Sequence, residues 1–252
     1  MKWFVNEGSI VREIWGKGDT ILFIFAGASA EFAVNKSVDW LYFTGKLPAD
    51  PLGRLFSTVT YARKIVFSEH HQAIRAIEQI VGIHREVEEK RGAKIPDWAY
   101  RDVLFMLIDY SIRSFELLER KLTEAEKSEV FSVFYQVGAG MGIPGLPTSY
   151  SEWKQMRAAH LQENLAKSNL SVDLYQQYKK HLGLIRYFLL KQVQAKLTPS
   201  RVNEILSLGQ GPALLLILPI YKLMRIFGIE QGFRNLLLPV EYKSQIADLD
   251  VK

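Results

Sequence analysis

The chain alternates short polar turns with longer segments in which apolar residues recur every three or four positions. This period is typical of amphipathic α-helices, and the strict apolar–polar alternation of half-buried strands is nearly absent. Residues that favour helix starts precede these segments, namely Asp19, Asp50, Ser68, Pro96, Thr123, Ser149 or Ser151, Ser171, Thr198 and Pro212. The pattern therefore predicts an all-α protein, a single compact domain of about nine to eleven helices.

One of the predicted helices carries a histidine on its apolar side. The positions at spacings of three and four on that side are Ile77, Ile80, His84 and Val87. A buried imidazole without a partner costs roughly 1–3 kcal/mol, so His84 needs a backbone carbonyl, a carboxylate or a metal. A satisfied core histidine is the commoner case, because metal sites usually have several protein ligands. Haem is the exception, because its porphyrin supplies four of the iron's ligands.

Composition agrees with one large domain that covers residues 1–252. A chain of 252 residues, 48% of them hydrophobic, can bury a substantial core. The absence of cysteine excludes disulfides, iron–sulfur clusters and thiolate ligation of a haem, and it fits a reducing compartment. The net charge of +5 is modest and forms no basic stripe with interleaved aromatic residues, so we expect no nucleic-acid partner.

Two apolar segments, residues 21–34 and 211–228, bear on contact with membranes. Both are too short or too interrupted to cross a bilayer. The second is expected in the core. The alternative is a membrane surface, with Lys222 and Arg225 at the level of the lipid headgroups. The first residues of the chain soon become polar and do not form a signal peptide. We therefore expect a cytoplasmic protein, with peripheral membrane contact through residues 211–228 as the alternative.

Other motifs point to structure more than to chemistry. Residues 140–145 satisfy GxGxxG, but they follow a predicted helix and contain a proline, which favours a helix-ending turn. His160 and His181 lie among polar residues without a carboxylate or second histidine at ligand spacing, so a zinc or di-iron site has no support. Asp109 lies in an apolar segment, where it either pairs with Arg113 or is a partner of His84's free ring nitrogen.

Two motifs carry a resemblance to a known family. Residues 50–58 read D-P-L-G-R-L-F-S-T, and residues 83–87 of the next helix read I-H-R-E-V. Together they resemble the haem b oxygenase superfamily, which includes the bacterial rubber oxygenases (latex clearing proteins) and the fungal oxygenase that trims the farnesyl chain in mycophenolic acid biosynthesis. Weaker similarity, including residues 107–116, extends from about Trp15 to about Leu165, and we align nothing after about Ser168.

The resemblance implies a buried haem b whose iron is held by His84. It implies that Arg54 and Thr58 line the haem pocket from the facing helix, and Tyr61 shares their helix face. A guanidinium suits the haem propionates, and hydroxyl groups suit a bound oxygen species. Rubber oxygenases carry a lysine directly before the threonine, where this chain has Ser57. We therefore expect no lysine cap on the iron.

Rubber oxygenases also use a glutamate as a catalytic base upstream of the arginine. No residue of this chain aligns with it, but Glu31 is a candidate on its chemistry because it interrupts the apolar run 21–34. Its alternative is a carboxylate at a helix edge.

The resemblance as a whole implies a haem b-dependent oxygenase that uses O2 to oxidise, or to cleave at C=C, an apolar substrate of isoprenoid or polyene type. The alternative is a non-catalytic helical protein that binds haem, a lipid or a protein partner.

Overall fold

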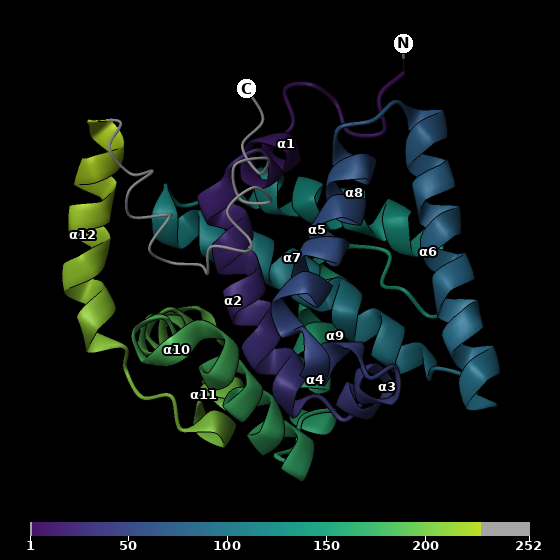
Figure 1. Ribbon diagram of the computed structural model, residues 1–252. Coiled ribbons are helices and arrows are strands. Elements are labelled where there is room, and N and C mark those ends of the chain that lie inside the picture. The colour runs from purple at the N-terminus through teal and green to yellow at the C-terminus, as the bar shows by residue number, and fades with distance from the viewer. Residues whose placement is uncertain (1, 228–252) are drawn as a thin grey trace.

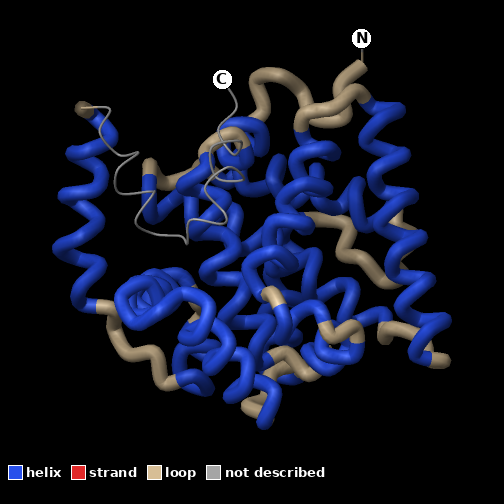
Figure 2. Tube along the Cα trace, viewed as in Figure 1, coloured by secondary structure: helices blue, strands red, loops and turns tan. Residues whose placement is uncertain are grey.

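The computed structural model describes residues 2–227, and these residues fold into helices joined by short connections (Figures 1 and 2). The helices are α1 (Ile10–Trp15), α2 (Gly18–Val34), α3 (Val38–Phe43), α4 (Lys46–Ala49), α5 (Pro51–Val66), α6 (His70–Arg91), α7 (Asp97–Leu118), α8 (Glu124–Gly140), α9 (Tyr150–Glu163), α10 (Asn169–Leu197), α11 (Ser200–Leu206) and α12 (Pro212–Ile226).

The predicted all-α class is confirmed. Eleven of the helices within residues 2–227 have six residues or more, and α4 is a single turn. Strand pairing in the same residues is limited to two isolated bridges, Trp3 with Glu69 and Asn35 with Leu165. One apolar cluster joins side chains from α1 to α12, as expected for a single domain. Met1 and residues 228–252, which the predicted domain includes, lie outside the described residues.

Several helices begin where the sequence predicts. The Asp50 carboxylate accepts a hydrogen bond from the Gly53 amide at 2.8 Å, and Pro51 occupies the first turn of α5. Thr123 and Glu126 form the predicted capping box of α8. The prediction for α10 is wrong by one turn: Ser168 caps this helix, and Ser171 completes the reciprocal hydrogen bonds from inside it. Residues 140–145 end α8 as predicted.

Helix α2 forms the centre of the molecule and packs against α7 and α10 (Figure 1). It is apolar on nearly all sides, which is typical of a buried helix. Asp19 lies inside its first turn, not at the predicted cap, and is buried. Helices α6 and α12 lie at opposite edges of the molecule, and α5 lies between α2 and α6 (Figure 1).

Helix α12 corresponds to the apolar segment predicted for residues 211–228, apart from residue 228, which lies outside the described residues. No described helix is both long enough and apolar enough to span a membrane. Arg225 pairs with Glu119 at 2.7 Å and with Asp19 at 3.5 Å. Arg225 therefore ties α12 to the body of the protein, and the contact of Lys222 and Arg225 with lipid headgroups stays a prediction.

Candidate active site

A large apolar cavity lies between the central helix α2 and the helices around it. Its volume is about 890 Å³, and its walls come mainly from α2, α5, α6, α7, α10 and α12. Cofactor and ligand sites commonly occupy roughly 300–1,000 Å³ and combine apolar walls with a few polar groups. Most of the lining residues here are apolar, so the few polar side chains indicate which chemistry the cavity supports.

His84 faces this cavity from α6. As predicted, Ile80 and Val87 lie on the same helix face and also line the cavity, but His84 is only partly buried because α6 is an edge helix. Its ring packs edge-on against the Tyr100 ring, with centroids 5.2 Å apart. The Tyr100 hydroxyl in turn donates to Glu88 at 3.2 Å. The His84 ring is therefore positioned by Tyr100, which Glu88 in turn holds in place through a hydrogen bond.

One ring nitrogen of His84, Nδ1, is buried and makes no hydrogen bond with any of the described residues. Burial lowers the pKa of the imidazole to about 4, with the positive charge of Arg54 in the same direction and Glu88 opposing. The ring is therefore neutral at pH 7, and a neutral imidazole can bind a metal.

Arg54 contributes a positive charge to the same cavity from α5. Its Nη1 donates to the Thr58 hydroxyl at 2.9 Å and to the Ser57 hydroxyl at 3.1 Å. None of the carboxylates in residues 2–227 forms an ion pair with it, and burial lowers the pKa of the guanidinium. A partly buried cation without a counter-charge favours an anionic ligand.

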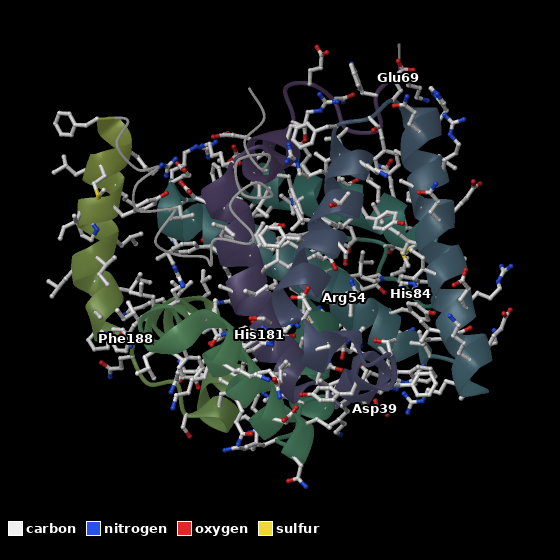
Figure 3. The ribbon with its side chains drawn as sticks, viewed as in Figure 1. Asp39, Arg54, Glu69, His84, His181 and Phe188 are labelled. Atoms are coloured by element: carbon white, nitrogen blue, oxygen red, sulfur yellow. The ribbon has the colours of Figure 1, made fainter. Side chains whose placement is uncertain are left out.

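The structure brings four of the predicted site residues together. Arg54, Thr58 and Tyr61 of α5 and His84 of α6 all line the cavity, as does Ser57. Figure 3 shows Arg54 and His84 at the same level of the molecule, on neighbouring helices. The adjacency follows from the packing of α5 against α6 and from the helical spacing of the three α5 residues.

Glu31 lies elsewhere. It is buried, does not line the cavity, and forms a two-pronged ion pair with Arg157 of α9, at 2.5 and 2.6 Å. The Tyr110 hydroxyl donates to the same carboxylate at 2.9 Å. Glu31 is thus not at a helix edge, and the catalytic role that we predicted for it stays a prediction without support from this geometry.

The ion pairs of Glu31 belong to a larger buried network. Arg157 also donates to Asp109 at 3.0 and 3.1 Å, and Asp109 pairs with Arg113 at 2.7 Å. Of the two interpretations of Asp109, the pairing with Arg113 is confirmed. Burial alone would lower the pKa of Arg157, but the carboxylates of Glu31 and Asp109 raise it overall. Arg157 could not be found from the sequence, because only the fold brings α9 to α2 and α7.

His160 also has a partner that could not be found from the sequence. This histidine is buried, stacks on Phe105 with ring centroids 5.2 Å apart, and forms a close pair with the carboxylate of Asp102. Asn35 and Asn164 donate to the same carboxylate at 2.8 and 3.0 Å. The polar sequence neighbours of His160 do not predict these surroundings, because Asp102 lies on α7, far from His160 in the sequence. Within residues 2–227, no three histidine or acidic side chains gather as a metal site.

The fold and the cavity define a helical protein with a large apolar chamber. One neutral histidine and one arginine that pairs with no described carboxylate line this chamber. The chain belongs to the family described as ER-bound oxygenase mpaB/B'/Rubber oxygenase, catalytic domain, whose family model matches residues 18–227. The resemblance found in the two short motifs is thereby confirmed and extended to most of the chain. Neither curated proteins nor solved structures gave a significant match. Membership in a family of oxygenases supports an oxidoreductase function.

Proposed function

We propose that this protein is a haem b-dependent oxygenase in which His84 binds the haem iron. The observation that carries the proposal is the state of His84: a neutral imidazole with an unpartnered buried nitrogen, on the wall of an apolar cavity of about 890 Å³. Leaving a buried polar atom unpaired is unfavourable in a protein interior, so the unpaired state is explained if the ring binds a ligand.

The donor set around the cavity fits haem better than a metal ion held by side chains alone. Within residues 2–227 no group of three potential protein ligands is present, and His84 is the histidine on the cavity wall. A porphyrin brings four nitrogen ligands of its own, so a single histidine is enough. The unpaired guanidinium of Arg54 fits the negatively charged propionates, which would give this cation the counter-charge that it lacks.

Under this proposal, the cofactor and the side chains around the cavity have different roles. Haem iron, when bound, supplies the capacity to bind and activate O2. His84 orients and holds the cofactor, supported by the Tyr100 ring. Thr58 and Tyr61 line the cavity. The Tyr61 hydroxyl can donate a hydrogen bond where negative charge develops, whereas the Thr58 hydroxyl accepts from the Arg54 guanidinium and donates to the Arg54 carbonyl. The apolar walls exclude water from the reacting groups.

The proposal assigns no proton transfer to Glu31, because Arg157 and Tyr110 occupy its two carboxylate oxygens. It also assigns no lysine to the distal side of the iron, because Ser57 follows Phe56 where rubber oxygenases carry that lysine. Small ligands such as cyanide are therefore expected to bind without a slow opening step.

The substrate that fits this cavity is an extended apolar molecule of isoprenoid or polyene type. The walls offer mostly carbon, and each buried methylene contributes about 0.8 kcal/mol of binding free energy. A sugar or nucleotide would leave many of its polar groups unpaired against such walls, at a cost of roughly 1–3 kcal/mol each.

Absorption spectroscopy of the purified full-length protein, with and without added hemin, tests the proposal. We expect a Soret band that saturates at one haem per chain and is extracted by acid–acetone, because the chain has no cysteine for thioether attachment. His84→Ala should weaken haem binding by more than about a hundredfold while the far-ultraviolet circular dichroism stays helical, since alanine is a good helix former.

His181→Ala is the matched control, because this histidine of α10 does not line the cavity. It should bind hemin like the unaltered chain. No spectral change on hemin addition, or a normal Soret band in His84→Ala, would refute the assignment and leave the non-catalytic binding protein as the alternative.

A further inference from the structure

The exposed apolar side chains of this protein are concentrated on two helices. Leu184, Ile185 and Phe188 of α10 and Leu216, Ile220 and Leu223 of α12 are between 51% and 74% exposed. We call these six side chains the C-terminal apolar surface. Outside α10, α12 and the residue after it, the large apolar side chains exposed in residues 2–227 are Phe43, Ile83 and Val103, and each of these lines the cavity. Exposed apolar patches of this kind indicate contact with another molecule or a membrane.

The two halves of the C-terminal apolar surface adjoin. Leu216, Ile220 and Leu223 form one stripe along α12, since they are four and three residues apart. On α10, Phe188 precedes Gln192 by one turn, and the Gln192 side chain accepts a hydrogen bond from the Ala213 amide in the first turn of α12, at 3.1 Å. Figure 3 shows Phe188 beside the N-terminal end of α12.

The opposite face of α12 belongs to the cavity. Leu214, Ile217, Leu218 and Tyr221 line it, and the Arg225 ion pairs hold the far end of the helix against the body. A single helix therefore separates the cavity from the C-terminal apolar surface.

Charge distinguishes this part of the chain from the rest. Residues 174–227 contain eight lysines and arginines and one acidic residue, whereas residues 1–173 contain 21 basic and 22 acidic residues. Lys167, Lys179 and Lys191 line one groove beside Tyr175 and Tyr187, and none of them pairs with a described carboxylate. Because Lys191 follows Phe188 by three residues, this basic groove adjoins the apolar surface.

We propose that α12 and the second half of α10 dock on an anionic lipid membrane. The C-terminal apolar surface would enter the boundary between headgroups and acyl chains, with the three lysines among the headgroups. A second copy of the chain is a poorer occupant, because face-to-face contact would bring two strongly basic surfaces together. The docked face would also deliver apolar substrate along α12 into the cavity, a step that rests on the proposed function, whereas the docking itself does not.

Vesicle flotation of the full-length protein tests the docking. The probes are vesicles of phosphatidylcholine alone and vesicles of equal parts phosphatidylcholine and phosphatidylserine. The protein should float with the anionic vesicles, less with the neutral ones, and less as salt is raised. Leu216→Ser with Ile220→Ser and Leu223→Ser should weaken binding to both kinds by at least about tenfold.

Charge variants separate the two contributions. Lys179→Ala with Lys191→Ala should weaken binding to anionic vesicles by about fivefold for each lysine and leave binding to neutral vesicles unchanged. Arg75→Ala with Arg85→Ala removes two exposed cations from α6, at the opposite edge of the molecule, and should change neither.

Three results would overturn the proposal. The first is a protein that does not float with anionic vesicles. The second is a lipid-free dimer that the triple serine variant dissociates, which would make the surface a contact between copies. The third is a lower melting temperature of the triple variant without lipid, which would show that the chain itself covers these side chains. Because the three positions are exposed, the triple variant is expected to melt at nearly the same temperature as the unaltered chain. Flotation needs no haem, so a protein that floats but shows no Soret band would refute only the proposed function.

Discussion

The fold contains two groups of ionisable side chains, one around Arg157 and one on the cavity wall, and they differ in how completely their polar atoms are paired. Around Arg157 the charges are complete. The guanidinium donates to both oxygens of Glu31 and to one oxygen of Asp109. Arg113 donates to the other oxygen of Asp109, and the Tyr110 hydroxyl donates to Glu31 as well. In the cavity the polar groups are incomplete. Arg54 has hydroxyl partners but no carboxylate, and the buried nitrogen of His84 has no partner among the described residues.

The completeness of pairing distinguishes a group that stabilises the fold from a group that binds a ligand. A buried charge is tolerated when its counter-charges and hydrogen bonds are present, as they are around Arg157. On the cavity wall, a cation lacks a counter-charge and an imidazole lacks a hydrogen-bond partner, and both lower the stability of the ligand-free protein. A ligand that supplies these partners regains that free energy when it binds. The complete group therefore holds α2, α7 and α9 together, and the incomplete one is where a ligand is expected.

Removing the centre of the complete group should have the largest effect. Arg157→Met leaves Glu31 and Asp109 buried without their shared cation, so we expect a loss of about 3–5 kcal/mol in unfolding free energy. Urea denaturation followed by circular dichroism measures it. Arg113→Met is the control, because this side chain is 40% exposed and Asp109 keeps Arg157, so its loss should be at most about 1 kcal/mol. If the Arg157 variant were as stable as the unaltered chain, the ion pairs around Arg157 would not stabilise the fold as we infer.

Glu31→Gln tests whether this group has a catalytic part as well. It keeps the size of the side chain but removes the charge that pairs with Arg157, so the unfolding free energy should fall while turnover per folded molecule is unchanged. A variant with normal stability and greatly reduced turnover would instead support the catalytic base that the family resemblance suggested.

The incomplete group should give a smaller, pH-dependent effect in the haem-free protein. The pKa of His84 is about 4 in the folded chain and about 6.5 when unfolded. Between these values the unfolded state binds the proton and the folded state does not, so stability is full above pH 6.5 and falls as pH drops toward 4. The loss should reach up to about 3 kcal/mol.

His84→Leu isolates this contribution from the carboxylates that titrate in the same range. The stability of the variant and of the unaltered chain, measured against pH, should run parallel above pH 7 and diverge below about 6.5, with the variant losing less. Parallel curves throughout would show that His84 titrates normally and that its environment is not as described.

The fold could be predicted from the sequence because most of it rests on local signals. The apolar period of three to four residues and caps such as Asp50 and Thr123 act within one or two turns. The errors occurred where a neighbouring residue could take the same role. Ser168, not Ser171, caps α10, because both side chains can form the reciprocal pair of hydrogen bonds.

In the candidate site, too, contacts between residues close in the sequence could be predicted, and contacts between distant residues could not. Arg54, Thr58 and Tyr61 share a face of one helix, and His84 lies on the helix packed against it, so spacing and a short motif were sufficient to group them. The partners of Glu31 and His160 could not be found in this way. Arg157 is 126 residues from Glu31, and Asp102 pairs with His160 across two helices. Only the tertiary fold makes these charges meet, so Glu31 could be noticed in its apolar segment but not paired, whereas Asp109 could be paired with Arg113 because the two lie one helical turn apart.

The smallest expected effect on stability is that of Arg54→Met, the counterpart of Arg157→Met in the cavity. Methionine keeps much of the side-chain volume. The Ser57 and Thr58 hydroxyls donate to the carbonyl of residue 54, at 2.7 and 3.3 Å, and can keep these hydrogen bonds in the variant. The substitution therefore leaves no buried polar atom without a hydrogen-bond partner. Because the guanidinium has no described carboxylate to lose, the unfolding free energy of the haem-free protein should stay the same or rise by up to about 1 kcal/mol. Hemin affinity should fall by about tenfold or more, because the propionates lose a charge-assisted hydrogen bond. Urea denaturation and hemin titration of the same preparation measure both quantities. A large loss of stability would place Arg54 with Arg157 among the structural cations, and it would remove the contrast on which the assignment of the cavity depends.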